Sequence, residues 1–583
     1  MRTHGPTTLL FLLPLLAACN ATRDTVQMAS EGALNAAPPP ALQHAEGAQA
    51  VPAGGTAVHA AAGAENSAPP PLYADLGTYH HPVTCTPQAQ QYFDQGLRLV
   101  YSFNHDEAVR AFKQAARLDP NCAMAYWGIA LALGPNINLP IDAERAQAAH
   151  AAVQQAAALA PKASAAEQAY IAALAMRYSR DPNADRQQLD RAYADAMRRV
   201  AQQYPDDLDA STLFAESLMD LRPWDLWSVD GQPRPETPEI VATLEGVLQK
   251  DPNHPGANHY YLHAIEASPN PERGLPSAVR LSTLVPGAGH LVHMPSHIYI
   301  RTGRYADAAA ANRQAIAVDE RYIAAAQPQG FYPMMYYPHN IHSLWAATSM
   351  QGRSADAIRA GRDVTAKVSP AMAREMPMLE YYTPTAYFAL ARFGRWQEIL
   401  AEPAPPDDLQ YTAAMWHYAR GLAYAATGRF ADAERERAAL DALAKQIPPN
   451  RIVGDNQPAW QLLRIASLLL AGEIASRHGQ CEEALPKLEE AVSVQDGLPY
   501  SEPPPWYYPA RESLGAAFLA CERPDAAAVV YREDLRRYPN NGWALYGLAQ
   551  ALREQKAPEA AAADEQFRAA WHDADIQLTS SRF

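Results

Sequence analysis

The feature that most constrains the fold of this chain is a short turn signature that recurs along it. A glycine is followed four and five residues later by an acidic residue and an alanine, in Gly303–Ala308, Gly428–Ala433 and Gly479–Ala484. Each signature lies between two stretches with helical spacing of apolar residues, and no alternating strand pattern competes with them. Such repetition is typical of supersecondary units that stack on their neighbours. The sequence therefore predicts an all-α chain of helical hairpins.

A 34-residue frame describes the first of these hairpins. When the frame begins at Ala89, positions 8, 20, 24, 27 and 32 are occupied by Gly96, Ala108, Phe112, Ala115 and Pro120. These residue types at these positions resemble the tetratricopeptide repeat. The resemblance implies a superhelical solenoid of roughly nine or ten helical hairpins between Pro87 and Trp571, with an extended concave groove.

The N-terminus has the character of an export signal. An apolar run from Leu9 to Leu16 is too short to span a bilayer, and it ends in Leu16-Ala17-Ala18-Cys19. This tetrapeptide resembles the bacterial lipobox, which implies that residues 1–18 are removed and that Cys19 is lipidated. Because Asn20 rather than Asp follows, we expect an exported, periplasmic protein anchored in the outer membrane rather than the inner one.

Residues 19–72 are rich in Ala, Pro, Gly and Ser, with almost no large apolar residues. Such a segment cannot form a core and is interpreted as a disordered tether with an r.m.s. reach of roughly 40 Å. The solenoid is expected to occupy residues 73–583, with its histidine-rich central repeats at 205–365. The net charge of −15 and the absence of a Lys/Arg block argue against a nucleic-acid partner.

Four further cysteines would lie in a compartment where disulfides persist. Cys85 and Cys122 flank the two helices of the first hairpin, and Cys481 and Cys521 lie on helices that pack antiparallel. Each pair is a candidate disulfide, and buried free thiols are the alternative for each.

Histidines are concentrated in the centre of the chain, where eight of the 18 lie between His254 and His342. Their spacings are three or four residues, which places neighbours on one face of a helix. The resemblance to the tetratricopeptide repeat implies that positions 2, 5 and 9 of each repeat line the groove. Frames set by Pro252, Gly303 and Gly352 put seven histidines at these positions in three consecutive repeats: His259, His263, His290, His293, His297, His339 and His342. The frame adds Glu266, and Glu216 and Asp220 from the preceding repeat.

We interpret these seven imidazoles as ligands for one or two transition-metal ions, with Cu, Zn and Fe as candidates because imidazole suits all three. Glu216 and Glu266 are candidate ligands or general bases of a metal-dependent oxidoreductase or hydrolase. The alternatives are a non-catalytic scaffold whose groove binds a peptide or an envelope protein, and a pH-sensing cluster. His259-x3-His263 lacks the Glu of the zincin motif, and the similarity to dinuclear type 3 copper proteins is confined to the histidine spacing.

Several other segments resemble a group of exported bacterial tetratricopeptide proteins. They are Phe103–His105, Gly134–Asn138, Asn258–Tyr261, Gly289–His297 and Pro505–Pro509. This resemblance implies the fold and export but supplies no mechanism. The repeat frame puts His105 in a turn away from the groove. Pro295 interrupts its helix, so the helix either kinks there or begins there, with His290 and His293 in the approach to it.

Overall fold

A computed structural model of the chain describes residues 70–328 and 330–583, which belong to one compact unit. The predicted signal peptide, Cys19 and nearly all of the predicted tether lie outside the described residues. Within the described part of the chain, no helix is long and apolar enough to cross a membrane.

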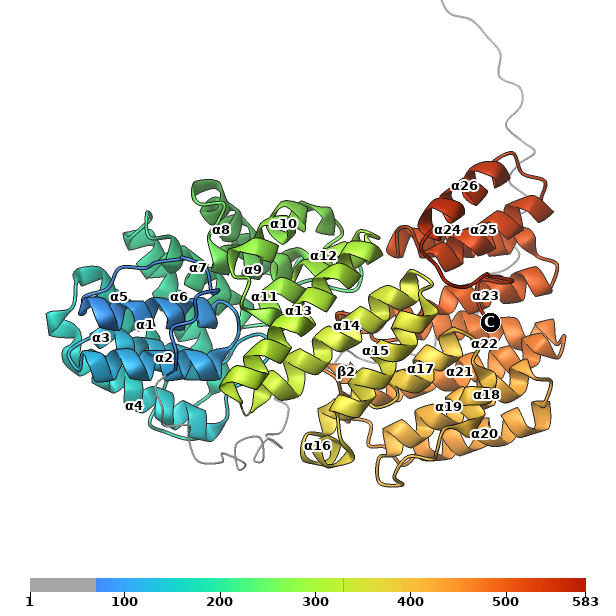
Figure 1. Cartoon of the computed structure of the whole chain (residues 1–583), viewed down its shortest axis with the longest axis horizontal. Coiled ribbons are helices and arrows are strands. Elements are labelled where there is room, and N and C mark those ends of the chain that lie inside the picture. Colours follow the sequence, from blue (N-terminus) through green and yellow to red (C-terminus); the bar gives the residue numbers. More distant parts are fainter. Residues whose placement is uncertain (1–69, 329) are drawn as a thin grey trace, which may run out of the picture. The chain divides into compact units, whose positions relative to one another are not determined.

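The described residues form an all-α solenoid of tetratricopeptide-like helical hairpins, which follow one another in chain order from blue to red (Figure 1). The first four hairpins pair α1 (Pro87–Val100) with α2 (His105–Leu118), α3 (Ala123–Leu133) with α4 (Ala143–Leu159), α5 (Ala165–Ala175) with α6 (Arg186–Gln203), and α7 (Leu208–Met219) with α8 (Thr237–Lys250).

Three central hairpins carry the histidines. They pair α9 (Pro255–Ile265) with α10 (Leu275–Leu284), α11 (Gly289–His293) and α12 (Pro295–Arg301) with α13 (Tyr305–Ala326), and α14 (Tyr337–Met350) with α15 (Ser354–Lys367). The helix breaks at Pro295, as that residue predicted, but His290 and His293 lie on a short helix of their own. A π-helical turn, η3 (Tyr332–Tyr336), leads into α14.

Five hairpins complete the chain. After α16 (Pro370–Glu375) they pair α17 (Thr385–Arg392) with α18 (Trp396–Ala401), α19 (Gln410–Ala426) with α20 (Phe430–Ala444), α21 (Ala459–Arg477) with α22 (Cys481–Asp496), α23 (Ala510–Ala520) with α24 (Pro524–Arg537), and α25 (Gly542–Glu554) with α26 (Ala560–Ala570). The described residues thus hold twelve hairpins rather than nine or ten, because short pairs such as α17 and α18 do not fill a 34-residue frame.

Small residues allow the helices of a hairpin to pack closely. A Cβ atom added at Gly96 or Gly128 would lie 2.6 or 2.4 Å from the ring of Phe112, which fills the space between α1, α2 and α3. Gly303 and Gly352 have φ of +70° in the turns after α12 and α14, a conformation that suits glycine. The small residues of the repeat signature are therefore explained by close packing between helices, and its turn glycines by a positive φ.

The two cysteine pairs that were candidate disulfides differ in the structure. Cys481 and Cys521 form a disulfide that joins the start of α22 to the end of α23. Cys85 and Cys122 are free thiols, so the disulfide predicted between them is not formed. The thiol of Cys85 is directed at Gln90 Oε1, 3.9 Å away, and hydrogen bonding with Cys122 raises the pKa of Cys85.

Candidate metal centre

Six histidines of the three central hairpins converge in the interior. His259 and His263 come from α9, His290 and His293 from α11, His297 from α12 and His339 from α14. All but His339 are buried, with exposed fractions of 0 to 4%. These six histidines lie close together, as their spacing in the sequence predicts. They lie within the protein, however, and not on an open concave face.

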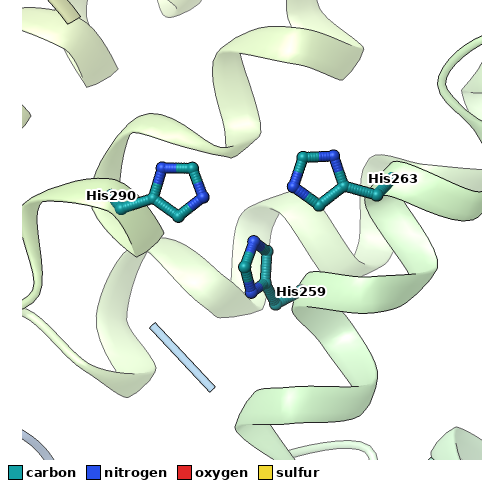
Figure 2. Close-up of side chains that lie close together, drawn as sticks. All are labelled: His259, His263 and His290. Carbon is teal, nitrogen blue, oxygen red and sulfur yellow. The ribbon is translucent and has the colours of Figure 1, made fainter. Parts of the chain in front are cut away.

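His259, His263 and His290 form the first triad, in which nitrogen atoms of the three rings lie within 4.8 Å of one another. The three rings point toward a common space (Figure 2). His259 Nδ1 donates to the carbonyl oxygen of Tyr101 at 2.7 Å. Since a carbonyl only accepts, Nδ1 of His259 carries the proton and its Nε2 presents a lone pair.

The inward nitrogens of this triad have no hydrogen-bond partner among the described residues. This is true of Nε2 of His259 and His263 and of both ring nitrogens of His290. A buried acceptor without a partner costs about 1–3 kcal/mol. Three such acceptors that face one another form a site that a cation would satisfy.

His293, His297 and His339 form the second triad. Nε2 of His293 lies 2.7 Å from Nε2 of His297 and 3.0 Å from Nε2 of His339. His293 Nδ1 donates to Asn312 Oδ1 at 2.6 Å, and the amide nitrogen of Asn312 is held by the carbonyl of Ala308. The remaining lone pair of His293 is therefore directed at the other two rings.

Glu266, the C-cap of α9, connects the two triads. Its Oε1 accepts from His263 Nδ1 at 2.9 Å, and its Oε2 accepts from His297 Nδ1. The three residues form a further group of potential ligands. Carboxylates that accept from the outer nitrogen of a histidine are the usual support of a metal-binding imidazole. Glu266 therefore fits a supporting role better than the role of general base.

The protonation states of these groups suit this arrangement. Burial lowers the pKa values of His259, His290, His293 and His339 well below 6.5, so these rings are neutral. Burial also opposes the ionisation of Glu266, but His297 and His263 outweigh it and lower the pKa of Glu266 to about 2. Burial would lower the pKa of His297, but Glu266 outweighs it and the net shift is upward.

A buried carboxylate on α13 fixes the backbone on both sides of the site. Asp319 accepts from Tyr332 OH at 2.8 Å and from Asn340 Nδ2 at 2.7 Å. Tyr332 OH in turn accepts from the backbone N–H of His290. Burial raises the pKa of Asp319 to about 7. This network ties the start of α11 to the part of α14 that carries His339.

A cavity of about 20 Å³ lies between the triads, which is room for one water-sized molecule. Its walls are formed by Asn138, Trp224, His263, His290, His297, Phe331, Met335, Tyr336, His339 and Asp455. Apart from the histidines and two polar side chains, these walls are aromatic or contain a thioether. A peptide does not fit this space.

Several residues of the site were not predicted from the sequence. The ring of Phe103, in the turn before α2, lies 4.5 Å from that of His259 and 5.5 Å from that of His290. The segments Phe103–His105 and Gly134–Asn138 were noted only for their resemblance to other proteins. Since Phe103 and Asn138 both contact the site or its cavity, these segments were the available signal.

Two carboxylates come from the C-terminal half of the chain. Asp455 lies in the turn between strands β1 (Ile452–Val453) and β2 (Gln457–Pro458), and Glu502 lies between α22 and α23. Burial raises the pKa of Asp455 to about 6 and that of Glu502 to about 7. The positive charge of His297 partly opposes this rise in the pKa of both carboxylates.

Two predicted site residues lie elsewhere. The ring of His342 packs against Trp345, Tyr381 and Tyr382, with centroids 4.8 to 5.3 Å apart, and His342 belongs to none of the ligand groups. The three-residue spacing from His339 puts His342 near the same face of α14, but its ring is packed among these aromatic side chains and not among the other histidines. Glu216 lies in a buried ionic cluster in which Asp220 pairs with Arg177, and the structure does not bring it to the histidines.

A fourth group of potential ligands contains His81, Asp207 and Asp209. His81 Nδ1 donates to Asp209 Oδ2 at 2.6 Å, and Asp209 also accepts from Tyr79 OH and Tyr101 OH. Burial would lower the pKa of His81, but Asp209 raises it to about 9. These groups satisfy one another as an ion pair with hydrogen bonds, so this cluster supports the fold.

Comparison with protein-family models gives no match for the chain, and comparison with curated protein sequences gives none either. Among solved structures, 82% of the chain aligns with 89% of a human IFIT1 dimer chain with PPP-AAAA, at 11% identity and a TM-score of 0.33. For yeast Tom70, 82% of this chain aligns with 89% of that chain, at 13% identity and a TM-score of 0.27. For the APC/C hetero-tetramer Cut9–Hcn1, 83% of this chain aligns with 88% of that chain, at 12% identity and a TM-score of 0.27.

Proposed function

We propose that this protein is a metalloprotein in which the two histidine triads each hold a transition-metal ion for metal-dependent chemistry of the oxidoreductase or hydrolase class. The observation that carries this proposal is the set of unpartnered, buried imidazole nitrogens in the first triad. Neutral imidazoles whose outer nitrogens donate to a carbonyl or a carboxylate have the tautomer that a metal requires.

The second triad supports the same proposal by a different argument. Both His293 and His297 donate from Nδ1, so their two Nε2 lone pairs face each other at 2.7 Å. Two acceptors this close repel each other unless a positive charge lies between them. A proton on His297 meets that need in the metal-free protein, and a metal ion that binds both nitrogens would replace it.

Metal content is the test. The full-length chain is reconstituted with Zn, Cu, Fe or Mn, dialysed and analysed for metal, beside a His293→Ala/His297→Ala variant. Two ions per chain are expected for the unmodified protein and at most one for the variant. The matched control is His80→Ala/His572→Ala, which removes two exposed imidazoles and should bind both ions. Absence of stoichiometric metal with all four ions would refute the proposal.

The second candidate function is a scaffold that binds a protein partner. An open cleft of about 300 Å³ is lined by residues of α6, α7 and α8, and it includes none of the histidines. Stacked helical hairpins offer extended surfaces of this kind. A protein that binds no metal after reconstitution would have this scaffold role as its remaining function.

We also propose that the protein is exported and anchored by a lipid on Cys19, with the outer membrane as its location. The tetrapeptide Leu16–Cys19 and the Ala/Pro-rich segment after it support this proposal. Labelling of cells with an alkyne fatty acid should modify the full chain but not a Cys19→Ser variant. Equal labelling of the two proteins would contradict it.

A further inference from the structure

We propose that the two triads hold copper as a pair and that the small molecule they meet is dioxygen. This inference rests on the proposed function, and it names the metal and the co-substrate of the same site. It is argued from the type and number of donors, the lining of the cavity, and the closeness of the triads.

The donors favour copper over the other candidates. Each triad offers three imidazole nitrogens, and both oxygens of Glu266 are engaged with the outer nitrogens of His263 and His297. Magnesium, calcium and manganese prefer oxygen ligands, whereas imidazole donors suit zinc, copper, iron and nickel. Copper binds nitrogen donors most strongly among the divalent metals of the first row.

The cavity adds a soft donor. Met335 lines the same cavity of about 20 Å³ as His290 and His339. A thioether is a soft donor, and soft donors suit Cu(I). Trp224, Phe331 and Tyr336 make much of the remaining wall aromatic, beside the polar side chains of Asn138 and Asp455. A molecule of two heavy atoms suits this small space better than an extended substrate.

The two triads are close enough to act together. The rings of His263 and His297, one from each triad, have centroids 5.6 Å apart, and those of His290 and His293 are 5.9 Å apart. Glu266 holds one ring of each triad through a single carboxylate. A pair of ions held in this way can deliver two electrons to one molecule.

The corresponding reaction is balanced. Two Cu(I) ions each lose one electron to become Cu(II), and one dioxygen takes both electrons with two protons and leaves as hydrogen peroxide. An added reductant, such as ascorbate, returns the two electrons to the copper ions. The reaction predicts one dioxygen consumed for every two copper ions oxidised.

The experiment loads the full chain with Cu(I) without oxygen, removes unbound copper and then admits air. Dioxygen uptake, hydrogen peroxide and the electron paramagnetic resonance of Cu(II) are followed. We expect two copper ions per chain and one dioxygen consumed per pair. His259→Ala and His339→Ala, which each remove one ligand from a different triad, should retain one copper ion and lose the paired uptake.

The control His80→Ala/His572→Ala should behave as the unmodified protein does. Three outcomes would overturn the copper and dioxygen assignment alone: zinc that displaces copper in direct competition, two bound copper ions that do not react with dioxygen, and single-copper variants that react as fast as the pair. Failure to bind any metal would instead refute the proposed function itself, so the two failures are distinguishable.

Discussion

The Nε2 atoms of His293 and His297 lie 2.7 Å apart although each ring already donates a hydrogen bond from Nδ1. Asn312 and Glu266 are the acceptors, so neither ring in its neutral form has a proton left for the contact. One positive charge is required between the two atoms. In the metal-free protein this charge is a proton, which Glu266 stabilises on His297.

Metal binding should therefore release a proton. The pKa of His297 is raised above 6.5 because Glu266 outweighs the effect of burial. A metal ion must displace this proton, so the apparent affinity of the second triad should fall as the pH falls through the raised pKa and level off above it. Calorimetry in buffers of different ionisation enthalpy counts the protons. Proton release of zero at pH 6.5 would contradict this account.

The same proton makes the metal-free fold depend on pH. A folded pKa above the unfolded value of 6.5 means that the His297–Glu266 pair stabilises the metal-free protein fully below pH 6.5. That contribution is lost as the pH rises through the folded pKa. Unfolding in urea is measured at pH 6 and pH 9, with Glu266→Gln as the reference in which this ion pair is absent. The loss of stability between the two pH values should be larger for the unmodified chain than for the variant, in which His81 still titrates.

Glu266→Gln should weaken both metal sites together. Only one oxygen remains to accept from His263 or His297, and the new amide N–H₂ would face the other Nδ1–H. We expect a loss in metal affinity of about 10- to 100-fold, measured by competition with a chelator. Glu272→Gln, an exposed change six residues away, is the matched control and should leave the affinity unchanged. A loss confined to one site would show that Glu266 does not couple the triads.

Gly289→Ala should destabilise the protein and impair the first triad. An added Cβ atom would lie 1.9 Å from Asp319 Oδ1, so Asp319 would have to move away from Tyr332 and Asn340. We expect a cost of about 1–3 kcal/mol in urea unfolding, and the loss of one metal ion through His290. Gly246→Ala on α8, where nothing lies within 4 Å, should instead stabilise by about 0.5–1 kcal/mol.

His342→Ala should separate folding from metal binding. The ring of His342 is buried against Trp345, Tyr381 and Tyr382, and it belongs to neither triad. Its removal should cost about 1–3 kcal/mol of stability while both metal ions remain bound. Elemental analysis of the purified variant measures the number of bound metal ions. The loss of one ion would show that His342 is a metal ligand.

The disulfide between Cys481 and Cys521 should stabilise the fold without affecting the metal sites. It closes a loop with a sequence separation of 40, for which the chain-entropy estimate is about 4 kcal/mol. Reduction should lower the midpoint of urea unfolding and add two reactive thiols per chain. The addition of four thiols would mean that Cys85 and Cys122 are also joined, contrary to the structure.

Local spacing was sufficient to predict much of the fold and of the site. His259 and His263 are four residues apart, so any helix through them places both rings on one face. The glycine-containing turns and the small residues packed around Phe112 reflect contacts within one or two repeats, and such contacts depend on neighbouring sequence alone. The all-α repeat fold and the convergence of six histidines followed from this local information.

What the tertiary structure decided depends on contacts between distant segments. Phe103 and Tyr101 reach His259 across more than 150 residues, and Asp455 comes to the cavity from a turn in the C-terminal half. The repeat frame located His342 and Glu216 by position alone, whereas the packing of α14 and the pairing of Arg177 with Asp220 assign them to other surroundings. Periodicity determines which face of a helix a side chain occupies, but only packing determines what covers that face. For this reason the sequence predicted an open groove of histidines, whereas in the structure they lie in a small, largely buried pocket.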